Sequence, residues 1–204
     1  MSVAVTAGYV CAEPRAEFYR HMHAANVDLK AFSEDFYHRL TGAHLAPVLE
    51  TLVYLKQETD VWFELTTLLI PGENDSDQEL HQMCQWVVEN LGPDVPMHFS
   101  AFHPDFKMLD YPPTPHESLR RARKIAVENG VRYAYVGNVH DRRDSSTWCH
   151  HCGELLIERD WYELGEWHLD AQGRCASCAT PVAGHFEAEH GDWGSRRQPV
   201  RLAG

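Results

Sequence analysis

The hydrophobic pattern of the first 139 residues predicts strands that alternate with helices. Short apolar or β-branched runs are centred near residues 3, 27, 61, 97 and 133. The longest run, from Val61 to Ile70, is almost continuously apolar, which is typical of a parallel strand buried on both faces. Strands that recur about every 30 residues, with helices between them, predict βα units with right-handed crossovers and a parallel sheet.

Helices between these strands are predicted from apolar spacings of three and four and from boundary residues. Pro14 suits the first turn of a helix, Ser33 and Asn74–Asp77 are typical of caps, and Gly130 is typical of a helix end. Five parallel strands are too few for an eight-stranded barrel, so the sheet is expected to be open or to belong to a larger barrel. The expected helices span about residues 15–25, 33–40, 45–57, 77–90 and 114–129.

Composition narrows the classes of partner. The 204 residues carry a formal net charge of -12 and 44% hydrophobic residues. Such an acidic chain disfavours nucleic acids and anionic membranes, which bind clustered Lys and Arg. The sequence has neither a membrane-length apolar stretch nor a signal-peptide pattern, which predicts a cytoplasmic protein.

Two CxxC pairs give the most specific chemical signal. Cys149 and Cys152, with Cys175 and Cys178, provide the four thiolates of a tetrahedral site. Four thiolates leave no position for water, so we expect a structural zinc ribbon, with iron as the chemical competitor. The expected divisions are 1–139 for the α/β part, 140–148 for a linker, 149–187 for the ribbon and 188–204 for a flexible tail.

The histidines near these cysteines and the two remaining cysteines are not expected to bind the metal. Residues His150, His151 and His168 are interpreted as hairpin surface. Cys11 and Cys84 are isolated in the sequence and are interpreted as free thiols, with Cys84 in the core.

Polar residues near strand ends are candidates for a second site. Asp28 and Lys30 are two residues apart, so they share one face of a strand at the end where α/β proteins bind ligands. A surface ion pair is the alternative interpretation. Thr66, with Glu64, is an unusual polar pair in the long apolar strand, whereas Thr6 is a weaker candidate of the same kind.

His103 is a further candidate, because it follows a strand in a polar and aromatic loop. It could hydrogen-bond a cofactor or substrate, or it could pack the loop.

The order of several segments resembles the radical S-adenosylmethionine (SAM) enzymes, in the pyruvate formate-lyase activating enzyme-like branch. Within this branch the sequence is most similar to the radical SAM enzymes of the AmmeMemoRadiSam system. The resemblance covers about residues 2–187. It rests on the terminal four-cysteine ribbon and on segments Val5–Tyr9, Asn26–Phe32, Leu69–Ser76, His98–Met108 and Tyr135–Asn138.

This resemblance implies a partial (β/α)6 barrel that binds S-adenosylmethionine and a [4Fe-4S] cluster. The cluster would cleave the cofactor to a 5′-deoxyadenosyl radical, which abstracts hydrogen from a protein or small-molecule substrate. By the same resemblance, Asp28 and Lys30 contact the methionine part of the cofactor, Thr6 lies near a monovalent cation, and His103 lies near the cofactor. The family has an arginine where this chain has Thr66, so the contact to the cofactor carboxylate differs here.

The cluster motif of that family, CxxxCxxC, is absent from the sequence, as is its Gly-Gly-Glu-Pro segment. We therefore expect the C-terminal part of a radical SAM barrel, inactive alone and poorly soluble because a strand near Val3 exposes its edge. A separate N-terminal half could supply the cluster. The alternative is a non-catalytic binding subunit, while an enzyme that uses the ribbon metal is disfavoured by its four thiolates.

Overall fold

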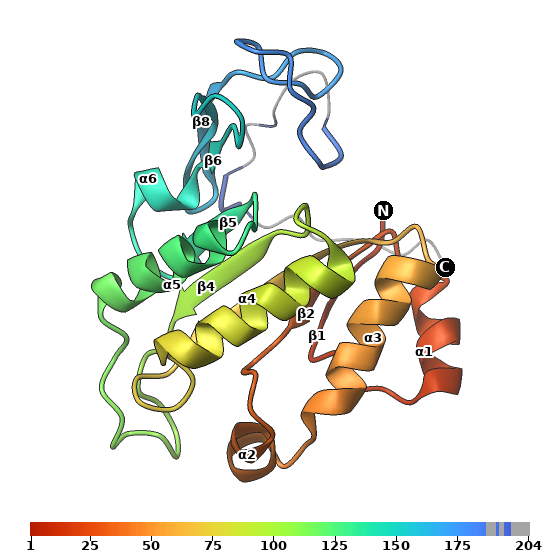
Figure 1. Ribbon diagram of the computed structural model, residues 1–204, viewed down its shortest axis with the longest axis vertical. Coiled ribbons are helices and arrows are strands. Elements are labelled where there is room, and N and C mark those ends of the chain that lie inside the picture. The colour runs from red at the N-terminus through yellow and green to blue at the C-terminus, as the bar shows by residue number, and fades with distance from the viewer. Residues whose placement is uncertain (187–190, 192–193, 197–204) are drawn as a thin grey trace. The chain divides into compact units, whose positions relative to one another are not determined.

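The computed structural model describes residues 1–186, 191 and 194–196 (Figure 1). The chain divides into an N-terminal unit, Met1–Val139, and a C-terminal unit, His140–Gly204. Most of the expected tail, 188–204, lies outside the described residues.

The N-terminal unit contains a five-stranded sheet in which every neighbouring pair is parallel. The strands lie in sequential order, from β1 to β5. Right-handed crossovers in a sheet of sequential order place all connecting helices on one face. The five strands are β1 (Val3–Thr6), β2 (Ala24–Asp28), β3 (Trp62–Leu69), β4 (Met97–Ala101) and β5 (Ala134–Gly137).

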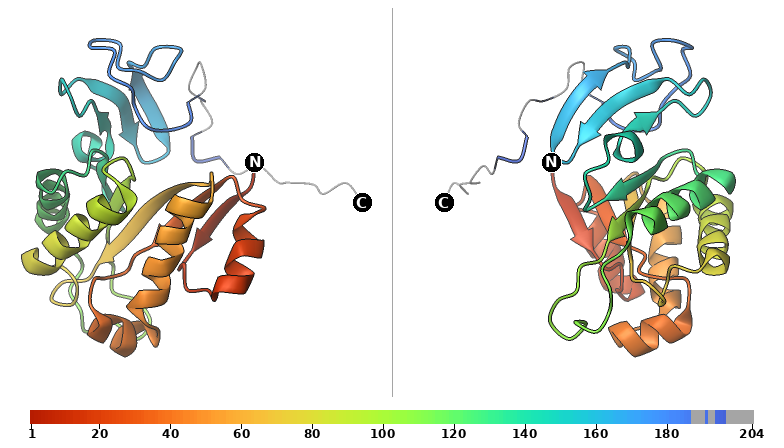
Figure 2. Two further views of the ribbon diagram at one scale, coloured as in Figure 1. Left: turned by 45° about the vertical axis from the view of Figure 1, so that its right-hand side comes forward. Right: turned by 90° about the vertical axis from the view of Figure 1, so that its left-hand side faces the viewer.

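The helices cover one face of this sheet, as Figures 1 and 2 show. Their apolar residues and alternate strand residues form one core cluster, in which Val27, Leu65 and Phe99 are fully buried. Two further short elements, α2 and the π-helix η1, follow β2. The helical elements are α1 (Ala12–Tyr19), α2 (Glu34–Phe36), η1 (Tyr37–Thr41), α3 (Leu45–Glu58), α4 (Asp77–Leu91) and α5 (His116–Glu128).

The opposite face of the sheet, called the open face below, carries partly exposed side chains. In β3, buried residues alternate with half-buried ones, so the expectation that this strand is buried on both faces is wrong. The half-buried residues are those whose side chains point away from the helices. At the sheet edge, Val3 and Val5 on β1 are 58% and 83% exposed.

The first predicted helix differs most from the structure. It ends at Tyr19, not at residue 25, and β2 already begins at Ala24. Parallel pairing explains the difference, since the backbone of His23 accepts a hydrogen bond from Trp62 and donates one to Ser2. The tertiary pairing overrides the apolar spacing that predicted a longer helix, and Phe18 is left 42% exposed.

Gly8 follows β1 in a left-handed conformation, with φ of +66°. A Cβ atom there would lie 2.8 Å from Cγ1 of Val27 in the core. Gly8→Ala is therefore expected to lower the free energy of unfolding by about 2 kcal/mol, from backbone strain and overpacking. Urea unfolding followed by circular dichroism measures this loss. Gly42→Ala is the matched control, because Gly42 has a φ of +66° but no atom within 4 Å of the added Cβ.

The C-terminal unit contains a short helix and an antiparallel sheet of order β6-β7-β8. The segment expected to be a linker, 140–148, contains α6 and β6. The side chain of Asp141 caps α6 by accepting a hydrogen bond from Asp144 N at 3.1 Å, and Thr147 pairs with Ile157. The elements are α6 (Arg142–Ser145), β6 (Thr147–Trp148), β7 (Leu155–Asp160) and β8 (Glu163–Trp167).

Among the described residues, no helix is both long enough and apolar enough to cross a membrane.

Candidate functional site

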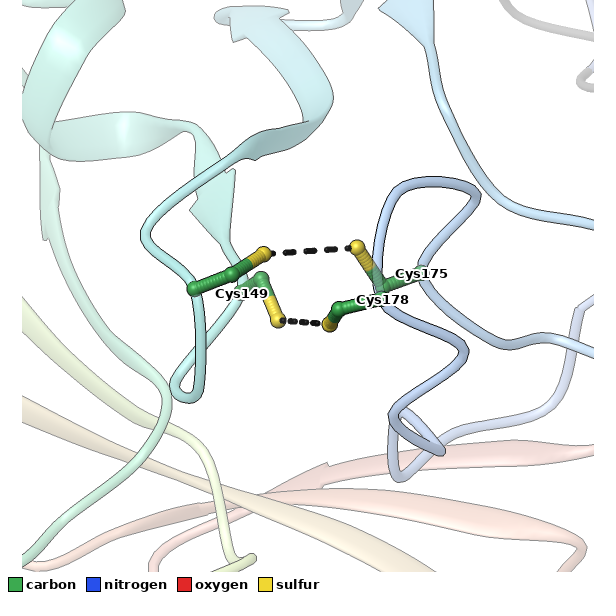
Figure 3. A group of neighbouring side chains, drawn as sticks. Cys149, Cys175 and Cys178 are labelled. Carbon is green, nitrogen blue, oxygen red and sulfur yellow. Dashed lines mark hydrogen bonds between the residues drawn. The ribbon is translucent and has the colours of Figure 1, made fainter.

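The four cysteines of the CxxC pairs converge in the C-terminal unit. Their sulfur atoms all lie within 4.8 Å of one another. In Figure 3 the side chain of Cys149 faces those of Cys175 and Cys178. The sulfurs of Cys149 and Cys178 are 3.6 Å apart, and those of Cys152 and Cys175 are 3.7 Å apart. These separations are far longer than a disulfide bond of about 2.05 Å. Among the described residues, this is the one group of three or more Cys, His, Asp or Glu side chains close enough to share a metal ion.

The two turns have the same backbone hydrogen bonds, which aim both thiols of each pair at one point. In the first turn, Gly153 N donates to Cys149 O at 2.9 Å and Cys149 N donates to Glu154 O at 2.8 Å. In the second, Ala179 N donates to Cys175 O at 2.8 Å and Cys175 N donates to Thr180 O at 2.9 Å. In both turns the residue after the second cysteine has a left-handed backbone conformation, with φ of 76° at Gly153 and 59° at Ala179.

The donor set fits a single tetrahedral ion. Sulfurs around zinc at about 2.3 Å are separated by about 3.8 Å, close to the observed spacings. Thr180 hydrogen-bonds Cys178 through its hydroxyl and its backbone N–H, which lowers the pKa of the Cys178 thiol to about 6. His168 hydrogen-bonds the carbonyl of Leu155 at 2.9 Å through Nδ1. The arrangement suits a structural metal centre closed to water.

A second group of polar residues lies on the open face of the N-terminal sheet. Strand register places Asp28 beside Thr66, Thr66 beside His98, and His98 beside Tyr135. We call these four residues the polar row. Side chains that are neighbours in register share a face, so the row crosses four strands and begins at the C-terminal end of β2.

Asp28 and Lys30 form a close ion pair, with Lys30 Nζ 2.6 Å from Asp28 Oδ2. Their side chains are 26% and 35% exposed. Asp28 is the last residue of β2, and Lys30 lies just beyond the strand. The ion pair of the alternative interpretation is therefore present, and it lies at the strand end where α/β folds bind ligands.

The main chain around Lys30 is held on several sides. Lys30 N donates to the hydroxyl of Tyr37 at 3.0 Å, and Lys30 O accepts from Nδ2 of Asn74 at 2.7 Å. Burial raises the pKa of Tyr37 to about 12, so its hydroxyl stays protonated. Nearby, Thr67 donates to Leu29 O at 2.8 Å. The backbone that carries this ion pair is fixed before any ligand binds.

Thr66 and Glu64, the polar pair of β3, have partners on the neighbouring strands. Thr66 donates to Oδ1 of Asn26 at 2.9 Å. Glu64 lies 2.6 Å from Nε2 of His98, and Trp62 Nε1 donates to it at 3.2 Å. Sequence reasoning did not assign Asn26 and His98. The signal that could have found them is register, because each occupies the same strand face as Thr66.

The structure does not bring Thr6 into the polar row. Thr6 pairs with Val27, whose side chain faces the helices, so Thr6 points to the opposite face from Asp28. Its hydroxyl instead accepts a hydrogen bond from Gly8 N at 3.1 Å.

His103 lies beyond β4 and is exposed, in the loop of residues 102–115 that leads to α5. This loop is held by Tyr111, whose hydroxyl donates to Glu73 at 2.7 Å. Glu73 also forms an ion pair with Arg39, which with Tyr111 lowers the pKa of the Glu73 carboxyl. No sequence pattern signals this contact, because its three members lie in three separate segments.

The chain has structural relatives. A domain of pyruvate-formate lyase-activating enzyme from Bacteroides vulgatus matches with a TM-score of 0.58 and 15% identity, covering 68% of this chain and 82% of that chain. A radical SAM methyltransferase from Sphaerobacter thermophilus matches with a TM-score of 0.55 and 17% identity, covering 66% of this chain and 39% of that chain. The fold is radical-SAM-like. These identities establish the fold alone.

Sequence comparison gives a longer relative. An uncharacterized protein of Methanocaldococcus jannaschii is 40% identical over 182 residues, which is 89% of this chain and 54% of that protein. The chain thus spans about half the length of the curated relative it matches. No protein-family model matches the sequence.

Proposed function

We propose that this chain is part of a radical SAM enzyme of the activating-enzyme type, in the AmmeMemoRadiSam group. In this proposal, Asp28 and Lys30 bind the amino-acid end of S-adenosylmethionine. The observation that carries it is the fixed Asp28–Lys30 pair at the C-terminal end of a strand in a radical-SAM-like fold.

Charge complementarity supports this assignment. The amino-acid end of S-adenosylmethionine carries an ammonium and a carboxylate, which match the carboxylate of Asp28 and the ammonium of Lys30. An ion pair that is partly exposed contributes little to stability, so exchanging its partners for those of a ligand costs little. Thr66 and His98 extend the polar row from this pair, and we propose that the open face faces the substrate. His103 would contact the cofactor from the loop after β4.

The [4Fe-4S] cluster of this proposal does not fit the cysteines described here. Cys11 is exposed beside α1 and Cys84 is buried in α4, whereas such a cluster needs several thiolates in one place. The other four cysteines have the spacing of a single-ion site. We therefore propose that the cluster is held by a segment other than the residues described here. Such a cluster would supply the electron for reductive cleavage of S-adenosylmethionine.

The edge of β1 is the proposed attachment point for that segment. Among the described strands, β1 pairs on one side, with β2, and Val3 and Val5 are strongly exposed. A further parallel strand would satisfy the backbone groups of this edge and cover both valines. The greater length of the Methanocaldococcus relative is consistent with such a segment. Catalysis would require this chain and the added segment together. In the four-cysteine ribbon, we propose that the bound ion is zinc.

Calorimetric titration of the purified chain with S-adenosylmethionine tests the cofactor site. Asp28→Asn and Lys30→Met are each expected to weaken binding by about tenfold or more, since each removes a charge-assisted contact. Asp94→Asn is the matched control, because Asp94 forms an ion pair with Arg132 at 2.9 Å outside the proposed site. Unchanged affinity in both site variants would refute the proposal.

A further inference from the structure

The turn that follows β3 connects two segments of the proposed cofactor site. Asn74 is fully buried and donates to Lys30 O at 2.7 Å and to Leu68 O at 2.9 Å, while it accepts from Ile70 N at 2.7 Å. These bonds anchor the turn to β3 and, at the same time, hold the segment of Lys30.

Glu73, the residue before Asn74, contacts two other segments of the chain. Its carboxylate pairs with Arg39 of η1 and accepts from the hydroxyl of Tyr111 at 2.7 Å. The side chain of Glu73 is only 12% exposed, so these two partners take the place of water. Arg39 in turn lies two residues after Tyr37, whose hydroxyl accepts the hydrogen bond from Lys30 N.

The Lys30 main chain is therefore held from both sides by groups that meet at one turn. Its carbonyl is bonded to Asn74 directly. Its N–H is bonded to Tyr37, and η1, which Tyr37 begins, is bonded through Arg39 to Glu73. The loop that carries His103 reaches the same carboxylate through Tyr111.

We infer that Glu73 is a positioning residue that fixes the Lys30 segment and the His103 loop relative to each other. Its relevance to a cofactor rests on the function proposed above. The geometric claim does not, because it concerns only contacts within this chain. Glu73 aligns the two segments before a ligand arrives, which reduces the entropy lost when both contact one molecule.

Two chemical probes report on the two segments separately. Lys107 is exposed in the loop, so the rate of tryptic cleavage after it, followed by mass spectrometry, reports on loop order. Acetylation of Lys30 by acetic anhydride, relative to exposed Lys56, reports on the Asp28–Lys30 pair.

Glu73→Gln is expected to raise cleavage after Lys107 by about tenfold and acetylation of Lys30 by about threefold, as expected when a charge-assisted contact is lost. Tyr111→Phe is expected to raise cleavage alone, and Arg39→Gln to raise acetylation. Glu50→Gln, an exposed change of the same chemistry on α3, should alter neither. Tyr111→Phe and Arg39→Gln each remove one partner of Glu73, so they keep the test decisive if Glu73→Gln does not fold.

If Glu73→Gln accelerates cleavage after Lys107 while Lys30 acetylation is unchanged, Glu73 holds only the His103 loop and not the Lys30 segment. The inference is then overturned. Unchanged rates at both positions would overturn it equally. Saturating S-adenosylmethionine should protect Lys107 in the wild-type chain but not in Tyr111→Phe. If the wild-type chain shows no binding of S-adenosylmethionine, the proposed cofactor role fails, while the cleavage and acetylation rates still decide the positioning role.

Discussion

Replacing Cys149 by serine is expected to unfold the C-terminal unit and to leave the N-terminal unit folded. Apparent binding energies of structural zinc in small domains are about 10–16 kcal/mol, which exceeds what so small a core supplies. The described buried apolar residues of this unit are few: Cys149, Leu156, Ile157, Cys175 and Val182. The N-terminal unit has its own continuous core, so we expect it to stay folded when the ribbon metal is lost.

Hydrogen-exchange mass spectrometry and metal analysis measure this effect. The amides of β7 and β8 should lose protection in Cys149→Ser, as they should when a strong chelator is added, while those of β3 and β4 stay protected. Wild-type protein should contain about one zinc per chain, and an iron-coloured protein would contradict zinc as the ion. Cys11→Ser is the matched control, because Cys11 is an exposed thiol outside the cluster.

Much of the N-terminal fold could be predicted from the sequence because strands and helices alternate in it at a regular interval. All five strands of the parallel sheet lie where the apolar runs predict them. The ends of elements were harder to predict. Met22 and Ala25 satisfy the apolar spacing of a helix, but pairing with β1 and β3 determines the conformation from His23 onward.

For the candidate sites too, some features could be predicted from the sequence and others depend on the fold. The four-cysteine cluster was predictable, because two CxxC turns have one simple geometric use. The spacing of Asp28 and Lys30 suggested that their side chains lie together, as the ion pair shows, but Lys30 lies just beyond β2 and the sequence could not show what fixes its backbone. Only the register of β1 against β2 shows which face of the sheet Thr6 occupies, and the sequence does not give this register. In the sequence Asn74 is an ordinary turn residue, and only the fold shows that Lys30, 44 positions away in the chain, bonds to it.

Asn74→Ala is expected to produce the largest loss of stability in the N-terminal unit, about 4 kcal/mol in the free energy of unfolding. Three backbone groups lose their partner in this variant: Ile70 N–H, Leu68 C=O and Lys30 C=O. Each lost hydrogen bond costs about 1 kcal/mol, and buried groups left unpaired add to this cost. Urea unfolding of the metal-loaded chain, followed by the circular dichroism of the helices, measures the loss.

A comparison with Asn90→Ala separates the role of burial from the loss of an amide. Asn90 is exposed on α4 and donates a single hydrogen bond to Trp86 O at 2.8 Å, so its replacement should cost less than about 1 kcal/mol. The melting temperature of Asn74→Ala should fall by roughly 10 °C, given about 2–4 °C per kcal/mol for a chain of this size. Equal losses in the two variants would mean that water replaces the Asn74 amide. The backbone of Lys30 would then be held by Tyr37 alone, and the preorganisation of the Asp28–Lys30 pair would have to come from η1 rather than from the turn after β3.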